Sequence, residues 1–167
     1  MNGNTAKPEE RLLALLLSEN LTVTTAESCT GGLIASRIVD VPGASAAFMQ
    51  GLVTYSNEAK MRYLGVKEET LRAHGAVSGE TAYEMAFFGA KTAGTDVCIA
   101  STGIAGPGGG TPEKPVGLIY IAAAAGDKCL VRELHLHGTR RENREKTAGE
   151  ALLLAVQLLE SLVSAKA

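Results

Sequence analysis

The spacing of apolar residues in the N-terminal part of the chain changes from a helical period to an extended run and back. Residues 8–18 place leucines at helical spacing behind Pro8 and two acids, which predicts an amphipathic helix beginning at Pro8. Residues 21–27 are short and β-branched, which predicts a strand, and residues 31–41 return to helical spacing. Ser28 therefore falls at a strand-to-helix junction.

The rest of the chain continues this alternation. The expected elements are, in order, a strand over 47–56, a short helix over 57–63, helices over 67–75 and 78–94, a strand over 95–104, a Gly- and Pro-rich loop over 105–117, two strands joined by a hairpin turn at 126–128, and a long helix over 139–163. Ser78 is the expected N-cap of the helix before the third strand, and Gly75 the expected end of the helix before that. Thr139 and Glu142 form a capping-box pattern at the start of the last helix.

Alternating strands and helices followed by a hairpin predict an α/β domain. A mixed sheet covered by helices on both faces fits this order. The 167 residues show no internal repeat and no linker, so we expect one domain over residues 1–167.

Charge and composition narrow the class of protein. The net charge of −2 and pI near 5.9 offer no field to attract DNA or RNA. The uninterrupted apolar runs, such as residues 118–125, are too short to cross a bilayer, and residues 1–10 lack the apolar core of a signal peptide. Three widely spaced cysteines predict free thiols rather than disulfides or a zinc site. We therefore expect a cytoplasmic protein that binds neither nucleic acid nor membranes, and nothing in the sequence requires a metal or a cofactor.

Polar residues mark the ends of the three predicted parallel strands. Ser28, Tyr55 and Thr102 each fall at the C-terminal end of one of them, where open α/β sheets bind ligands. Lys60 follows Tyr55 by five residues and can turn back over the same edge. Four polar groups from three segments are thus expected to converge.

Ser28 has two interpretations, a helix N-cap or a nucleophile. N-capping is an ordinary role of serine and is slightly favoured by the sequence alone. A nucleophilic serine needs a base, and the histidines fit poorly: His74 lies near a helix end, while His135 and His137 alternate with leucines on the expected solvent face of a strand. A desolvated lysine is another known activator of serine, so Lys60 becomes the candidate base, although most lysines on short helices simply face water.

Three further groups of residues are candidates for binding. Cys29 ranks below Ser28 as a nucleophile, because no neighbouring charge indicates a lowered pKa. The glycines after Ser28 and after Thr102 supply backbone N–H groups suited to an oxyanion or a phosphate, although they match neither a Walker loop nor a dinucleotide fingerprint. Arginines cluster at residues 140, 141 and 144, at the start of the last helix. Two interpretations are equally good: they bind an anion, or they form a solvated basic turn paired with neighbouring acids.

Several long motifs together resemble one known family. They are residues 25–45, 51–66, 74–78, 101–122 and 137–144, and the similarity runs from about residue 8 to the last helix. The chain resembles the CinA C-terminal domain family, whose members include nicotinamide mononucleotide deamidases. The resemblance implies a three-layer α/β/α sandwich with a mixed, mainly parallel sheet.

The resemblance also implies an activity and its residues. The activity is hydrolysis of nicotinamide mononucleotide to nicotinic acid mononucleotide and ammonia, in pyridine nucleotide salvage. The resemblance implies Ser28 as nucleophile, Lys60, Tyr55 and Thr102 in the catalytic group, and, most simply, Arg140 as an arginine of the site. With the glycine-rich turns added, the residues expected around the substrate are Cys29, Thr30, Gly31, Gly32, Gly103, Gly106, Arg140 and Arg144. The family often has an acid where Thr139 stands, so the choice between Arg140 and Arg144 as phosphate ligand stays open. The alternative is a non-catalytic nucleotide-binding or regulatory module, and leucine-rich helices at both ends suggest a homo-oligomer.

Overall fold

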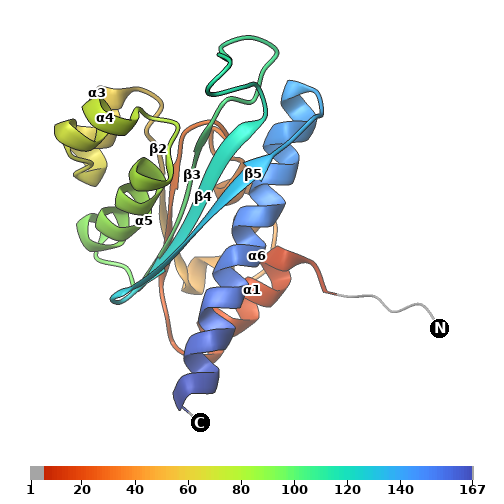
Figure 1. Cartoon of the computed structure of the whole chain (residues 1–167). Helices are drawn as coiled ribbons and strands as arrows, with labels where there is room; N and C mark the ends of the chain where they lie inside the picture. Colours follow the sequence, from red (N-terminus) through yellow and green to blue (C-terminus); the bar gives the residue numbers. More distant parts are fainter. Residues whose placement is uncertain (1–5, 167) are drawn as a thin grey trace.

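The computed structural model describes residues 6–166, so the first five residues and the last residue of the predicted domain lie outside the described part (Figure 1). Its elements are α1 (Pro8–Ser18), β1 (Val23–Glu27), α2 (Leu33–Val39), the 3₁₀ turn η1 (Ala44–Ala46), β2 (Phe48–Val53), α3 (Asn57–Ala59), the π-helical turn η2 (Lys60–Leu64), α4 (Glu68–His74), α5 (Gly79–Ala93), β3 (Val97–Gly103), β4 (Leu118–Ala125), β5 (Lys128–His135) and α6 (Arg140–Lys166).

The five strands form one mixed sheet in the order β2-β1-β3-β4-β5. β1 is parallel to β2 and β3, whereas β4 is antiparallel to both β3 and β5. Four strands therefore point the same way and β4 points back, which confirms the predicted mixed sheet. The register places Glu27 of β1 opposite Val53 of β2 and Ser101 of β3, so these three strands end at one edge.

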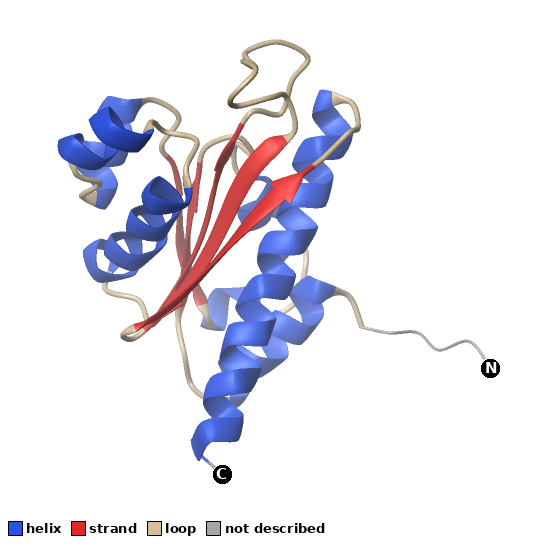
Figure 2. Cartoon of the chain, viewed as in Figure 1, coloured by secondary structure: helices blue, strands red, loops and turns tan. Residues whose placement is uncertain are grey.

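Helices cover both faces of the sheet, which confirms the three-layer sandwich (Figure 2). One core contains side chains of α1, α2 and α6 packed on Ile99, Ile119 and Ile121. The other contains side chains of η2, α4 and α5 packed on small sheet residues such as Ala100 and Ala122. β1 and β3 lie between the two layers and are buried almost throughout, as expected for central strands.

Most predicted boundaries hold to within a few residues because their signals are local. α1 begins and ends where predicted, and the Ser78 hydroxyl accepts a bond from Thr81 N, as expected of the N-cap of α5. The predicted strand over 47–56 is shorter than expected and ends at Val53. The physical reason is Ser56, whose side chain accepts from Ala59 N and begins α3 directly after the strand.

The last helix, α6, has 27 residues, far more than the uninterrupted apolar runs, such as residues 118–125, that are too short to cross a bilayer. Thr139 and Glu142 bond reciprocally at its start, which confirms the capping box. By length and composition alone it is apolar enough to span a membrane, with a mean hydropathy of 1.4 over 18 residues. The core helix of a globular protein can have the same length and hydropathy. The buried face of α6, including Ala151, Leu152 and Leu159, packs in the core on one side of the sheet.

Candidate active site

The carboxyl ends of the three parallel strands bring the predicted polar residues to one edge of the sheet. Ser28 follows β1 directly, and its backbone N–H donates to Ser101 O at 2.9 Å. On the other side, Thr54 N donates to Glu27 O at 2.8 Å, which holds the segment leading to Tyr55 beside β1. Strand pairing therefore places Ser28 between the ends of β2 and β3.

Lys60 reaches back from η2 to this edge. Its Nζ lies 3.1 Å from Ser28 Oγ, 2.9 Å from the Thr54 carbonyl oxygen and 3.3 Å from the Tyr55 carbonyl oxygen. Lys60 is almost fully buried, with 1% of its surface exposed to solvent. The Ser28 hydroxyl thus faces a buried amine, and the N-cap role favoured by the sequence alone is wrong: the N-cap position of α2 is Gly32.

The surroundings of Lys60 favour an uncharged amine. Burial lowers the pKa of Lys60 below its ordinary value of 10.5, and the neighbouring Cys29 opposes this shift. Among the described residues, no carboxylate lies within 4.0 Å of Nζ to stabilise its charge. A neutral amine has two N–H donors and one lone pair, which matches two carbonyl oxygens and one hydroxyl. In that state the lone pair can accept the proton of the Ser28 hydroxyl, 3.1 Å away.

Glu27, which the sequence reading missed, organises the turn after β1. This residue is fully buried, and its Oε2 accepts from Thr30 Oγ1 at 2.5 Å and from the amides of Gly32 and Ile34, both at 3.0 Å. Its Oε1 accepts from Ala35 N at 2.9 Å. The carboxylate therefore satisfies the first amides of α2, a role that the sequence assigned to serine. An acid at the end of an apolar strand, just before a helix, was the available signal.

The amides of residues 29–32 divide into two groups. The Gly31 amide donates to Ser28 O at 3.1 Å, and the Gly32 amide donates to the Glu27 carboxylate. Across residues 6–166, the amides of Cys29 and Thr30 have no hydrogen-bond acceptor. These two N–H groups, directly after Ser28, are the ones available to a developing negative charge.

Cys29 itself lies in an environment that disfavours a thiolate. Burial raises the pKa of its thiol to about 11. The thiolate is the nucleophilic form of cysteine. The structure therefore supports ranking Cys29 below Ser28 as a nucleophile.

The two candidate arginines have different partners. Arg140 donates to the Tyr55 hydroxyl at 3.1 Å and to Gly106 O at 2.8 Å, which links three segments at the edge of the site. Arg144 donates instead to Cys29 O at 3.1 Å and to Thr30 O at 2.7 Å. Both line a cavity of about 360 Å³ together with Leu33, Arg141 and Glu145.

Tyr55 contacts Lys60 through its backbone and not through its hydroxyl. The carbonyl oxygen accepts from Nζ, whereas the phenol is 62% exposed with its hydroxyl on Arg140. Thr102 is buried, and its Oγ1 donates to Ala76 O at 2.7 Å, between α4 and α5. Thr102 therefore holds a neighbouring connection in place and does not bond to Ser28 or Lys60.

Asn143, also missed in the sequence, fixes the glycine-rich loop. Its side-chain amide donates to Ala105 O and to Gly138 O, both at 3.0 Å, and its Oδ1 accepts from Gly138 N. Gly103 ends β3, and Gly106 has a φ of +90° just after Ala105. The loop thus leaves the sheet edge in one defined direction. The sequence shows only a polar residue in a charged helix, so no local signal indicated this role.

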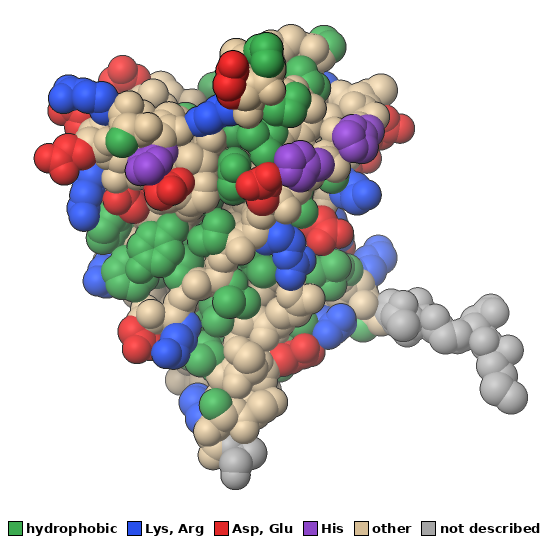
Figure 3. Space-filling view, in the orientation of Figure 1, with side chains coloured by type: hydrophobic (Ala, Val, Ile, Leu, Met, Phe, Trp, Pro, Cys, Tyr) green, Lys and Arg blue, Asp and Glu red, His purple; other side chains and the backbone are tan. Residues whose placement is uncertain are grey.

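Among the described residues, the histidines make no hydrogen bond to Ser28 or to the side chain of Lys60. All three are exposed, and Figure 3 shows histidine side chains at the surface, which confirms that they are solvated. Within residues 6–166, no group of three or more His, Cys, Asp or Glu residues could hold a metal ion.

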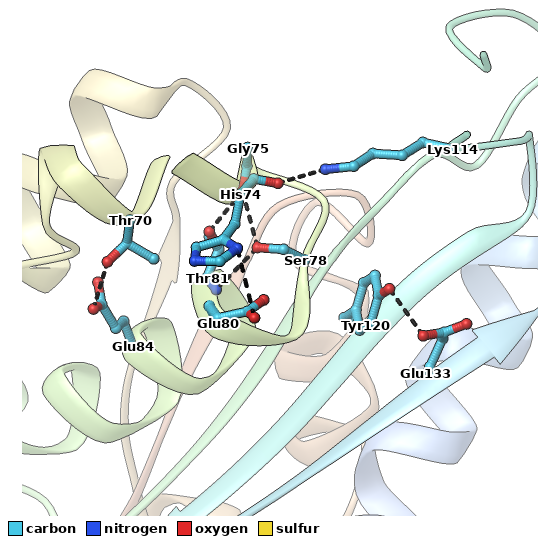
Figure 4. Close-up of polar contacts among 10 residues, drawn as sticks. All are labelled: Thr70, His74, Gly75, Ser78, Glu80, Thr81, Glu84, Lys114, Tyr120 and Glu133. Atoms are coloured by element: carbon cyan, nitrogen blue, oxygen red, sulfur yellow. Dashed lines mark hydrogen bonds and ion pairs between the residues drawn. The ribbon is translucent and has the colours of Figure 1, made fainter. Parts of the chain in front are cut away.

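A second cavity, of about 620 Å³, lies between α4, α5 and the outer strands. Figure 4 shows its polar groups paired with one another: His74 with Glu80, and Tyr120 with Glu133 at 2.9 Å. Burial, followed by the bond to Glu133, raises the pKa of Tyr120 to about 12. Lys114 reaches from the loop to the His74 carbonyl oxygen. This cavity shows no arrangement of an activated nucleophile and a base.

Comparison with known proteins agrees with the fold and the motifs. The family model for the CinA C-terminal domain matches residues 5–159. A putative competence-damage inducible protein of Clostridium acetobutylicum is 53% identical over 144 residues, and a CinA-like protein of Kosmotoga olearia is 54% identical over 155 residues. These alignments cover 86% and 93% of this chain but only 35% and 38% of those proteins, so the chain spans little more than a third of their length.

Solved structures match over nearly the whole chain. The competence/damage inducible protein CihA from Agrobacterium tumefaciens is 41% identical with a TM-score of 0.84, covering 94% of this chain and 99% of that one. A CinA superfamily protein from Enterobacter cloacae is 34% identical with a TM-score of 0.89, covering 95% of this chain and 96% of that one. Because the family model matches residues 5–159 of this chain and these solved structures share its fold, the chain belongs to the CinA C-terminal domain family.

Proposed function

We propose that this protein is an amidohydrolase that converts nicotinamide mononucleotide to nicotinic acid mononucleotide and ammonia. The observation that carries the proposal is the 3.1 Å contact between Ser28 Oγ and the buried Nζ of Lys60, an amine with a lowered pKa. A serine beside a neutral lysine is a known arrangement for acyl transfer. Family membership supports the nucleotide substrate, and so does Arg140, which lines a basic cavity and bonds the hydroxyl of Tyr55.

The reaction follows from the partners of each group. Ser28 Oγ attacks the carboxamide carbon as Lys60 Nζ accepts the hydroxyl proton, and the oxyanion lies against the amides of Cys29 and Thr30. The tetrahedral intermediate collapses when the protonated Lys60 gives its proton to the leaving nitrogen, which departs as ammonia. A water molecule then attacks the nicotinoyl ester, transfers a proton to Lys60 and releases the carboxylate, and Ser28 recovers its proton.

Residues around the pair supply recognition in this proposal. Arg140, with an exposed position and a bond to the Tyr55 hydroxyl, binds the phosphate as a charged fork. Gly103 and Gly106 let the chain leave the sheet edge beside the pair without a side chain: a Cβ on Gly103 would lie 2.6 Å from Cα of Ile119, its partner in β4. Replacing Arg140 with Met is expected to raise KM for the mononucleotide and to leave the riboside lacking phosphate unaffected.

A second candidate is a nucleotide-binding or regulatory module without turnover. The observation that favours it is that the curated relatives are named for competence or damage induction and extend well beyond this chain. Such a module would bind the mononucleotide saturably and release no ammonia.

Ammonia release from nicotinamide mononucleotide, with chromatographic detection of the acid product, separates the two. Ser28→Ala and Lys60→Met are expected to lose turnover by at least about a thousandfold while keeping the fold. Ser45→Ala and Lys128→Met, at exposed positions, are the matched controls and should keep wild-type rates. Wild-type protein that binds the nucleotide without producing ammonia would leave only the binding module.

A further inference from the structure

Arg144 bonds to the outside of the turn that follows Ser28. It lies in the first turns of α6, and its Nε and Nη2 donate to the carbonyl oxygens of Cys29 and Thr30, more than a hundred residues away in sequence. The contact is close: a Cβ on Gly31, which has a φ of +60°, would lie 3.3 Å from Arg144 Nη2. The planar guanidinium therefore fits two successive carbonyls at once.

The direction of these carbonyls fixes the direction of the amides. In a trans peptide the N–H points opposite to the C=O of the same plane. The plane that presents Cys29 O to Arg144 must turn the Thr30 N–H away from it. The plane that presents Thr30 O likewise turns the Gly31 N–H away, and that N–H closes the turn onto Ser28 O at 3.1 Å. Arg144 thus sets the orientation of one unbonded amide and of the turn that carries it.

Glu27 acts on the same turn from the other side. Its carboxylate bonds the Thr30 hydroxyl and the amides after Gly31, so the segment is held through its carbonyls by a cation and through its later N–H groups by an anion. Neither Glu27 nor Arg144 forms a hydrogen bond with the amides of Cys29 and Thr30. A turn held in this way needs no reorganisation when charge develops beside it.

We propose that Arg144 is a positioning residue for the oxyanion-binding amide of Thr30 and for the turn that carries it, and that it is not the phosphate ligand. The proposal rests on the proposed amidase function and deepens it. It also assigns separate tasks to the two arginines: Arg140 recognises the anionic group of the substrate, and Arg144 acts on the reacting carbonyl through the backbone.

The kinetic test compares Arg144→Met, Arg144→Lys and Arg140→Met with nicotinamide mononucleotide as substrate. Arg144→Met is expected to lower kcat about 10- to 100-fold with KM changed less than about twofold, since the side chain does not touch the substrate. Arg144→Lys, which keeps the charge but offers a single point donor, should fall between Arg144→Met and wild type and covers the case in which the Met variant fails to fold. Arg140→Met should instead raise KM. Arg72→Met, on the exposed surface of α4, is the control.

A second readout does not require the amidase reaction. A fluorophosphonate reagent phosphonylates an activated serine and displaces fluoride, and the rate depends on the base and the oxyanion site but not on nucleotide recognition. Labelling of Ser28, followed by intact mass, should slow about tenfold in Arg144→Met while its pH midpoint, set by Lys60, stays that of wild type. If wild-type protein is labelled but releases no ammonia, the proposed substrate fails and the Arg144 comparison still holds.

Two results would overturn the role of Arg144. One is wild-type kcat and wild-type labelling in both Arg144 variants. The other is a raised KM with unchanged kcat in Arg144→Met, which would make Arg144 an anion ligand.

Discussion

Glu27→Gln tests whether a buried carboxylate holds the turn beside Ser28. The substitution keeps the size of the side chain and replaces one acceptor oxygen by an NH₂ group. Oε2 of Glu27 accepts three bonds and Oε1 accepts one, from Ala35 N. The better orientation of glutamine keeps the three bonds and turns its NH₂ toward Ala35 N–H, so that a donor faces a donor.

The expected cost follows from these bonds. One lost hydrogen bond to a charged group costs about 1.5–3 kcal/mol, and the three that remain weaken because their acceptor is neutral. Relief from burying a charge offsets part of this loss. We expect a net loss of about 2–4 kcal/mol in the free energy of unfolding, which for a chain of this length lowers Tm by roughly 5–15 °C.

Urea and thermal unfolding followed by circular dichroism measure this loss. Glu113→Gln, at an exposed position in the loop, is the matched control and should stay within about 0.5 kcal/mol of wild type. A Glu27→Gln protein as stable as its control would refute the reasoning that the carboxylate holds the turn. Because the same turn carries the amides after Ser28, a lowered kcat should accompany the lowered stability.

Three further substitutions test other parts of the structure. The folded-state pKa of Lys60 lies below 10.5, so the unfolded chain binds more protons between the two values, and the stability of wild type relative to Lys60→Met should rise with pH up to about 10.5. A difference in urea unfolding that stays constant with pH would contradict the burial of this amine. Gly117→Ala should lose about 3–5 kcal/mol, because φ is +90° and the new Cβ would collide with Leu136 O, whereas Gly94→Ala, with φ of +67° and open space, should lose only about 1–2 kcal/mol; equal shifts in Tm would count against the collision. Thr102→Val should lose about 1 kcal/mol by thermal unfolding, since its hydroxyl bonds a backbone carbonyl, and an unchanged Tm would show that this bond contributes nothing.

The fold was predictable where its signals are local. Helical spacing and Pro8 gave the bounds of α1, a serine before a periodic segment gave the cap at Ser78, and apolar runs around residues 126–128 gave the hairpin. The convergence of Ser28 and Lys60 was also predictable, because parallel strands that pair in register end at one edge.

The supporting residues of the site were harder to predict because their partners are distant or are backbone atoms. Arg144 and Asn143 donate hydrogen bonds to backbone carbonyl oxygens of residues far from them in sequence, and no motif near either residue indicates those partners. The sequence favoured the wrong role for Ser28, that of helix N-cap, for a related reason. Either a serine hydroxyl or a buried acid can satisfy helix amides, and only the folded chain shows that Glu27 does so.

The central claim is that Lys60 is uncharged near neutral pH and takes the Ser28 proton. Its most direct test is an NMR titration of the Lys60 side chain, labelled with ¹³C at Cε, alongside the pH dependence of kcat/KM for ammonia release. We predict that Lys60 titrates well below 10.5 and that its midpoint coincides with the pH at which kcat/KM falls on acidification. A Lys60 that titrates at its ordinary value in active protein, or a rate that is indifferent to its protonation, would contradict the claim.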